Sequence, residues 1–295
     1  MATIPRETPD FARTPWRRRL KVAERIGAYL LLGILGVILL APFYFMIIGS
    51  LMDGGEMFQV PPTFWPQELI WENYSALFDR FPFWTYIRNS IVVAVAQTVG
   101  VLFFCSLAGF VFAKRRFPGR DWLFIVVLVS SMLPHGQTTI IPFYLLMVKF
   151  DWVNTFWPLI VPWWAPPLSS FLMRQYIANG VPDELIDAAT LDGTSVFGIY
   201  RRIVLPLVAP GLVVIGVLQF IAVWNDFLYS LLILKTEEMR TVTLALVELS
   251  TRTQAATTYG PLFAGMVLAT VPTVLLYIVF QRRLTSGILS GSLRG

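Results

Sequence analysis

The sequence predicts an all-α integral membrane protein with six transmembrane helices, both ends in the cytoplasm, and a cytoplasmic helix–turn–helix between the fourth and fifth spans. Of the 295 residues, 56% are hydrophobic and only 14% are charged, whereas water-soluble domains carry roughly 25% charged residues. The apolar runs are long and continuous, and this excludes the alternating pattern of a membrane β-barrel. The composition therefore places most of the chain in a lipid bilayer.

Six runs are long enough to cross a bilayer, which requires about 20 apolar residues. They define a transmembrane domain at 26–281. Prolines interrupt the third and fourth runs, and membrane helices tolerate such breaks where neighbours or a water-lined cavity satisfy the freed backbone groups. The predicted spans are about 26–51, 87–113, 122–148, 155–177, 206–234 and 259–281.

The basic residues predict the orientation of these spans. Six spans put both termini on one side, and cytoplasmic segments carry an excess of Lys and Arg. With the N-terminus inside, 17 of the 23 Lys and Arg residues lie in inner segments. This predicts a basic cytoplasmic arm at 1–25, a cytoplasmic loop at about 178–205 and a cytoplasmic tail at 282–295. Charge gathered in loops indicates membrane topology rather than nucleic-acid binding. The six outer residues are Arg80, Arg88, Lys149, Lys235, Arg240 and Arg252.

The predicted outer loop at about 52–86 is acidic and rich in Pro and Trp. Aromatic side chains of this kind favour the membrane interface. Two interpretations stay open: a structured cap that contacts an external partner, or an interfacial loop without such a role.

The most polar segment in the second half of the chain is 182–195. It opens with a proline followed by two acids, which is typical of a helix start. Glu184 and Asp187 then fall on one helical face. Gly193 permits a turn, and Ser195 can cap a following helix. Because a polar helix–turn–helix suits a lipid-facing role poorly, we expect it to dock on a soluble partner.

This segment resembles the EAA loop of ABC-importer membrane subunits, whose usual form is Glu-Ala-Ala, three residues, then Gly. Here it reads Asp187-Ala188-Ala189-Thr190-Leu191-Asp192-Gly193. Other stretches resemble the carbohydrate-importer permeases of the maltose type. The resemblance covers roughly 85–295 well and the first span loosely. The matching stretches are Arg88-Asn89-Ser90, Ile141 to Leu146, Val153-Asn154-Thr155, Phe171 to Gln175 and Trp224 to Leu228.

The resemblance implies that the loop couples transport to ATP hydrolysis. In the family, it docks in a cleft of a cytoplasmic ATPase, where its acidic residue pairs with a basic one. Asp187 occupies that position but is one methylene shorter than the usual Glu, so Glu184 can share the pairing. The alternative is a solvated loop without a docking role. The coupling residues implied are Glu184, Asp187, Ala188, Ala189, Asp192 and Gly193.

Nothing in the sequence predicts an enzyme. The chain has no Gly-x-x-x-x-Gly-Lys-[Ser/Thr] phosphate loop, no paired catalytic carboxylates and no metal-spaced His/Cys cluster. We therefore expect no metal and no cofactor on this chain, with ATP and Mg bound by partner ATPase subunits. The single histidine, His135, lies in the third span, where it either lines the pathway or has a structural role.

A polar triplet in the fifth span is a candidate for lining the solute pathway. Ionisable groups at membrane depth usually face a cavity or a partner charge. Hydrogen-bonding groups beside an aromatic ring suit a sugar, although an intersubunit polar contact explains them equally well. The triplet is Trp224, Asn225 and Asp226.

The end of the chain is rich in Gly and Ser, which is typical of a flexible terminus. In related permeases, this tail enters the interface between the ATPase subunits, which is the second interpretation. The residues concerned are Ser292, Leu293, Arg294 and Gly295.

The sequence as a whole predicts a permease subunit of a binding-protein-dependent ABC importer for a sugar or sugar derivative. It would lie in a bacterial or archaeal cytoplasmic (inner) membrane. Its expected partners are a homologous second permease, two copies of a cytoplasmic ABC ATPase, an extracytoplasmic solute-binding protein and the lipid bilayer. The alternatives are an importer for a polyol or glycerol phosphate, and a secondary transporter driven by an ion gradient through Asp226 and His135.

Overall fold

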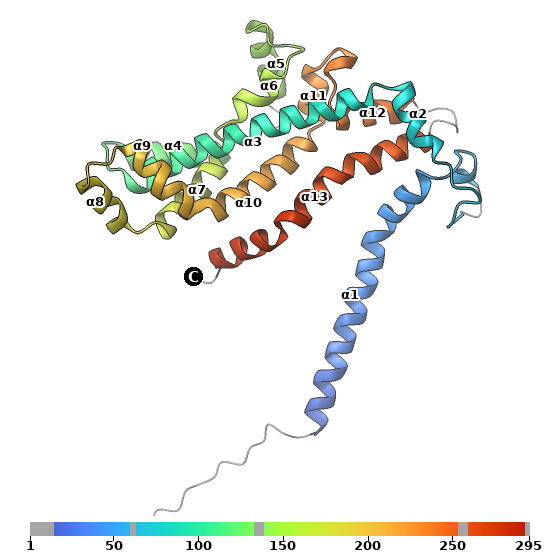
Figure 1. Cartoon of the computed structure of the whole chain (residues 1–295), viewed down its shortest axis with the longest axis horizontal. Helices are drawn as coiled ribbons and strands as arrows, with labels where there is room; N and C mark the ends of the chain where they lie inside the picture. Colours follow the sequence, from blue (N-terminus) through green and yellow to red (C-terminus); the bar gives the residue numbers. More distant parts are fainter. Residues whose placement is uncertain (1–14, 60–62, 133–138, 253–258, 293–295) are drawn as a thin grey trace, which may run out of the picture.

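The computed structural model describes residues 15–59, 63–132, 139–252 and 259–292, and every regular element in these ranges is helical. Three long helices run side by side along the molecule (Figure 1): α3 (Phe83–Lys114), α10 (Leu205–Trp224) and α13 (Tyr259–Ser292). The long helix α1 (Pro15–Gly49) meets α13 near one end of this bundle and then diverges from it.

Shorter helices complete the flanks and ends of the bundle. We call the end formed by α8 and α9 the α8 end, and the opposite end, formed by α2 and α12, the α12 end (Figure 1). The shorter elements are η2 (Glu56–Phe58), α2 (Glu72–Arg80), α4 (Arg120–Met132), α5 (Ile140–Lys149), α6 (Trp157–Ile160), η3 (Val161–Trp163), α7 (Pro167–Gly180), α8 (Asp183–Leu191), α9 (Val196–Ile199), the π-helical turn η4 (Tyr200–Val204), α11 (Leu228–Ile233), η5 (Glu237–Met239) and α12 (Val242–Arg252).

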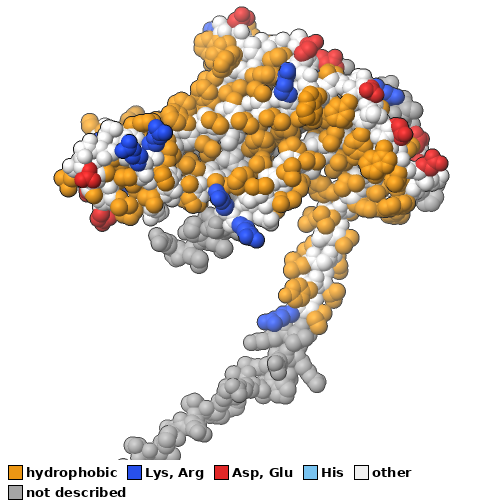
Figure 2. Space-filling view, viewed as in Figure 1, with side chains coloured by type: hydrophobic (Ala, Val, Ile, Leu, Met, Phe, Trp, Pro, Cys, Tyr) orange, Lys and Arg blue, Asp and Glu red, His pale blue; other side chains and the backbone are white. Residues whose placement is uncertain are grey.

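Four helical stretches in the described residues are long and apolar enough to cross a membrane: Glu24–Gly49, Phe83–Lys114, Val196–Trp224 and Tyr259–Arg283. They overlap the predicted first, second, fifth and sixth spans. Most large side chains of α1 are exposed to the surroundings of the chain, and an apolar helix that its own protein leaves uncovered is typical of a membrane span. Figure 2 shows the same apolar character over much of the visible surface, with acidic side chains gathered at the two ends.

The predicted third and fourth spans are not single helices. The third contains α4 and α5, separated by residues outside the described ranges. The fourth is divided into α6, η3 and α7, and each of these segments has a proline in its first turn. Proline is tolerated at the start of a helix but not in its interior. Prolines of the fourth span therefore begin new helical segments, whereas Pro134 of the third span lies outside the described residues.

The predicted fifth span begins earlier and ends earlier than 206–234. Helix continues without a break from α9 through η4 into α10. The π-helical turn directly precedes Pro206, which has no N–H group to donate to the preceding turn. At the other end, α10 stops at Trp224, where the Asn225 side chain donates to the carbonyl of Ile221 over 2.8 Å. The acid at 226 therefore lies in a turn and not within the helix.

Close backbone approaches hold α7 against α3 and α10. A Cβ atom built on Gly109 of α3 would lie 2.9 Å from the backbone nitrogen of Arg174 in α7. A Cβ atom on Gly211 of α10 would lie 2.8 Å from the ring of Tyr176. At both contacts glycine is required because any side chain would separate the helices.

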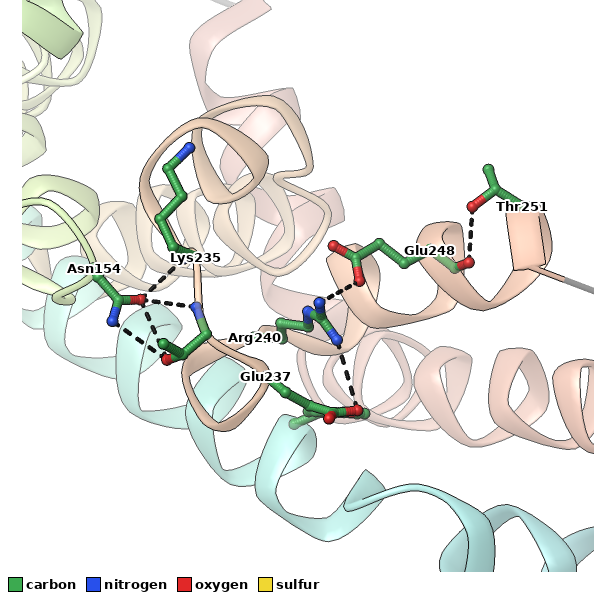
Figure 3. A network of polar contacts seen from close by, with 8 residues as sticks. Asn154, Lys235, Glu237, Arg240, Glu248 and Thr251 are labelled. Carbon is green, nitrogen blue, oxygen red and sulfur yellow. Dashed lines mark hydrogen bonds and ion pairs between the residues drawn. The ribbon is translucent and has the colours of Figure 1, made fainter.

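The segment between α11 and α12 is held at the α12 end by two asparagines far away in the sequence. The Asn89 side chain donates to the carbonyls of Glu238 and Arg240 over 2.7 and 3.0 Å. Asn154 accepts from the backbone nitrogens of Lys235 and Thr236 over 2.9 and 3.1 Å (Figure 3). Both asparagines belong to the motifs on which the family resemblance rests, and the structure gives each motif a local structural role.

Ion pairs of Arg240 also hold the segment between α11 and α12. The Arg240 guanidinium lies 2.8 Å from the Glu248 carboxylate and 3.6 Å from the Glu237 carboxylate (Figure 3). The backbone nitrogen of Val242, at the start of α12, donates to the hydroxyl of Ser90 over 2.8 Å. These contacts fix the chain between α11 and α12 on top of α3.

Candidate functional site

In residues 182–199, α8 is followed by a turn at Gly193 and by the short helix α9. Pro182 precedes α8 in an extended conformation, with two acids in the first helical turn. Gly193 has a φ of +72°, and a Cβ atom there would meet nothing within 4 Å, so its glycine serves the left-handed backbone alone. The Ser195 hydroxyl accepts from the backbone nitrogen of Gly198 over 3.2 Å, which confirms the predicted cap.

Five of the six predicted coupling residues are exposed: Glu184, Asp187, Ala188, Asp192 and Gly193. The sixth, Ala189, is only 8% exposed and packs inside the loop with Ile186. Ala189 therefore contributes to the core of the loop and not to its surface, because it faces the opposite side of α8 from Asp187.

The exposed surface of the loop combines acids with large apolar side chains. Leu191 is 89% exposed and Phe197 57% exposed. Neither Glu184 nor Asp187 forms an ion pair with any residue that the structure describes. Exposed apolar side chains next to unpaired carboxylates are what a protein-docking surface requires. We call this exposed face of 183–197 the loop surface.

The inner face of the loop is anchored on α3. The Tyr200 hydroxyl lies 2.7 Å from the hydroxyl of Ser106, and the Tyr200 ring packs against that of Phe110. Ile199 and Val204 are buried in the same cluster. The loop is thus seated on a rigid element of the bundle.

An ion pair that the sequence did not reveal attaches the start of α8 to the end of α3. Lys114 Nζ donates to Asp183 Oδ1 over 2.7 Å and to the carbonyl of Ala178 over 3.5 Å. The Lys114 side chain is 7% exposed and that of Asp183 is 77% exposed. The ammonium group holds the pKa of the Asp183 carboxyl below its ordinary value. No local pattern signals a contact between residues 69 positions apart.

The predicted pathway triplet is divided by the structure. Trp224 is 3% exposed; its Nε1 donates to the carbonyl of Ala269 over 3.0 Å, and its own carbonyl accepts from Thr243 over 2.7 Å. It therefore ties α10 to α12 and α13. Asn225 is exposed and binds the end of its own helix.

Asp226, the third residue of the triplet, lies two residues before the start of α11. One oxygen of its carboxylate, Oδ2, accepts from both the backbone nitrogen and the hydroxyl of Ser230, over 3.0 Å each. Asp226 also lines a cavity of about 180 Å³ that neither Trp224 nor Asn225 reaches. The structure thus brings one of the three predicted pathway residues to the lining of a cavity.

The remaining predicted positions lie at the margins of the described structure. Helix α13 extends through Ser292, whereas Leu293, Arg294, Gly295 and His135 lie outside the described residues. Within the described ranges, no group of three or more His, Cys, Asp or Glu side chains is arranged to hold a metal ion.

Long apolar helices, an exposed polar loop seated on them and a polar cavity between them define a helical membrane-transport subunit. The chain belongs to the family of binding-protein-dependent transport system inner membrane components, whose model matches residues 105–289.

Its relatives include arabinooligosaccharides transport system permease protein AraQ of Halalkalibacterium halodurans, which is 34% identical over 257 residues, or 86% of this chain and 91% of the relative. The sn-glycerol-3-phosphate transport system permease protein UgpE of Salmonella typhi is 29% identical over 262 residues, or 86% and 92% of the two chains. A chain in the crystal structure of a bacterial ABC transporter involved in the import of the acidic polysaccharide alginate shares the fold. Its TM-score is 0.81 at 22% identity, and the match covers 93% of this chain and 99% of that one.

Proposed function

We propose that this chain is the membrane-spanning permease subunit of an ATP-driven importer that translocates a sugar or sugar derivative delivered by an external binding protein. The observation that carries the proposal is the loop surface, which presents unpaired carboxylates and exposed apolar side chains at one end of a bundle of membrane helices. Membership of the binding-protein-dependent family supports the same function.

The solute class rests on the relatives. The protein named for arabinooligosaccharide transport, at 34% identity, favours a sugar. The relatives named for sn-glycerol-3-phosphate transport keep a glycerol phosphate as the second candidate.

The proposed topology has six spans, with both termini and the 178–205 loop in the cytoplasm. It is supported by the distribution of basic residues along the chain. In this topology the third span would cross the membrane through α4 and α5, and the fourth through α6, η3 and α7. The loop surface would then face the same compartment as a cytoplasmic ATPase.

The proposed complex contains this chain, a homologous second permease, two ATPase copies that bind ATP and Mg, and an extracytoplasmic binding protein. A chain with a similar fold comes from the crystal structure of a bacterial alginate ABC transporter in complex with an alginate pentasaccharide-bound periplasmic protein. In the complex proposed here, Asp187, with Glu184 beside it, pairs with a basic residue of the ATPase. The tail from Ser292 onward lies at the ATPase interface.

Solute-stimulated ATP hydrolysis by the reconstituted complex tests this function. We expect Asp187→Ala to reduce the stimulation about tenfold or more, because a charge in the ATPase cleft loses its partner. Asp121→Ala is the matched control: it also removes an exposed carboxylate, but from α4, outside the loop.

The solutes to compare are arabinotriose, maltose and sn-glycerol 3-phosphate. Loss of stimulation in Asp187→Ala alone, with all subunits still co-purifying, supports ATP coupling through the loop. Uptake that continues without ATP and follows an ion gradient would instead identify a secondary transporter.

A further inference from the structure

A cavity of about 180 Å³ lies beside α3 and α10, next to the turn that contains Asp226. Pockets that hold a drug-sized molecule enclose roughly 300–1,000 Å³, so this cavity has room for one ring of a solute. Its lining contains polar groups and two aromatic rings. The lining residues are Ser90, Val93, Gln97, Leu159, Trp163, Gln219, Ala222, Val223, Asp226, Tyr229, Ser230 and Thr241.

Two polar lining residues are buried and have no hydrogen-bond partner among the described residues, and the Thr241 hydroxyl is itself a fully buried atom. Gln97 is 6% exposed, and its side-chain amide bonds to no residue that the structure describes. The hydroxyl of Thr241, a residue that is also 6% exposed, has no partner either. Because nearly all buried polar groups in folded proteins are satisfied, such groups indicate a bound water or ligand.

The apolar part of the lining contains an aromatic pair. The rings of Trp163 and Tyr229 have centroids 4.8 Å apart and are inclined at 68°. Ring faces beside amide and hydroxyl groups match a ligand with apolar C–H faces and several hydroxyls. Ring faces form no hydrogen bonds with a water cluster, so they favour a ligand with C–H faces over water alone.

The charge of the lining restricts the ligand further. Asp226 is the one ionisable carboxylate among the described lining residues, and neither Lys nor Arg is present there. A phosphate or carboxylate on the solute would meet a like charge and no cation. An uncharged ring would meet hydrogen-bond donors and acceptors of both kinds.

We propose that this cavity is a solute subsite on this subunit and that it takes one uncharged, hydroxylated ring, which makes a neutral sugar the substrate class. The proposal rests on the proposed function and selects between its two solute candidates. The relevant groups are the unpartnered Gln97 and Thr241, the Trp163–Tyr229 pair and the absence of a cation among the described lining residues.

Protection of an introduced cysteine tests occupancy of the cavity independently of ATP. Thr241→Cys would be made in a Cys105→Ser background, which removes the one native cysteine. Membrane vesicles that contain the complex would be treated with a small maleimide. We expect arabinotriose or maltose to slow modification about tenfold, and sn-glycerol 3-phosphate at equal concentration to leave it unchanged. Protection by the phosphate, or by none of the sugars, would overturn the proposal.

A matched pair of variants tests the contribution of the cavity to transport. Gln97→Leu and Thr241→Val remove the two unpartnered groups. Thr98→Val is the control, because its hydroxyl is also buried and unpartnered on α3 but does not line the cavity. We expect sugar uptake to fall about tenfold for each cavity variant, since a lost hydrogen bond has effects of that order, and to be retained in Thr98→Val.

Different results contradict the solute subsite and the permease function. Equal uptake by the cavity variants and the control, with transport still ATP-driven, contradicts the subsite and leaves the permease function intact. Ion-driven uptake without ATP contradicts the permease function, while the cysteine protection still decides whether the cavity binds a sugar.

Discussion

Lys114 and Asp183 connect the start of the loop helix α8 to the end of α3. The ammonium group is nearly buried, whereas the carboxylate is largely exposed, so solvent screening keeps the energy of this pair small. Its importance is geometric: Lys114 also binds the carbonyl of Ala178 at the end of α7, and one side chain thereby joins three helices at the base of the loop surface.

This ion pair makes a pH-dependent contribution to stability. The pKa of Asp183 is lowered in the folded chain by Lys114, so the contribution is complete above the unfolded pKa of about 4. It is lost as the pH falls through the lower folded pKa. We expect Asp183→Asn to melt at a slightly lower temperature than the wild type at pH 7, and this difference to vanish well below pH 4. The measurement is thermal unfolding in detergent across this range.

Asp187→Asn is the control for this comparison, because Asp187 lies on the same helix and forms no ion pair with a described residue. A destabilisation of Asp183→Asn that stayed constant down to low pH would show that the ion pair is not its cause.

Single residues in the loop were predictable where the signal was local. Gly193 and Ser195 adopt the predicted turn and cap because both roles depend on neighbours within a few residues. Ala189 lies on the buried side of α8, and the match to the family motif does not reveal which alanine points inward. Lys114–Asp183 was missed because it depends on how α3 and α7 pack.

At the scale of helices, α3 and α7 cross with backbone against backbone at Gly109. Gly109 leaves no space between its α-carbon and the backbone of Met173 and Arg174. Backbone atoms cannot move aside as a flexible side chain can. The close crossing therefore depends on a single missing methyl group.

We expect Gly109→Ala to destabilise the protein by about 1–3 kcal/mol, the usual cost of overpacking. Gly36→Ala on α1 is the control, because a Cβ atom there meets nothing within 4 Å. Melting temperatures of the purified variants in detergent provide the comparison. Equal melting of Gly109→Ala and the wild type would mean that α3 and α7 can separate without loss.

Helix content was predictable from the apolar runs, and helix ends were less so. The prolines near 158–167 predicted breaks, but only the structure shows that they start new segments. The early end of α10 at Trp224 was missed because an apolar run resumes at 227–234, directly after Asn225 and Asp226. A polar Asn-Asp pair was the available signal, since both side chains can bind local backbone.

At the scale of the whole molecule, two of the family motifs hold the same segment. Asn89, Ser90 and Asn154 belong to motifs far apart in the sequence, yet all bind the chain from Lys235 to Val242. The cavity beside it combines side chains from α3, α10 and this segment. Composition and motifs predicted the class of protein, but the cavity could not be predicted because it exists only once these distant segments meet.

Asn89 of α3 holds the segment between α11 and α12 in place. Asn89 is 2% exposed and donates to two carbonyls, those of Glu238 and Arg240. Asn89→Ala would leave both acceptors without this donor, at a cost of about 1–3 kcal/mol for buried groups. We expect backbone amides at 234–241 to exchange hydrogen faster, because local opening of the segment would require less free energy.

Hydrogen–deuterium exchange of the purified protein measures this opening directly, and Asn225→Ala is the control. Asn225 is exposed, and its side chain binds only the end of its own helix, so its removal should leave exchange at 234–241 unchanged. Because Thr241 at the edge of this segment lines the cavity, faster exchange should accompany faster maleimide modification of Thr241→Cys in the Asn89→Ala background. Unchanged exchange in Asn89→Ala would mean that Asn154 and Arg240 hold the segment without it.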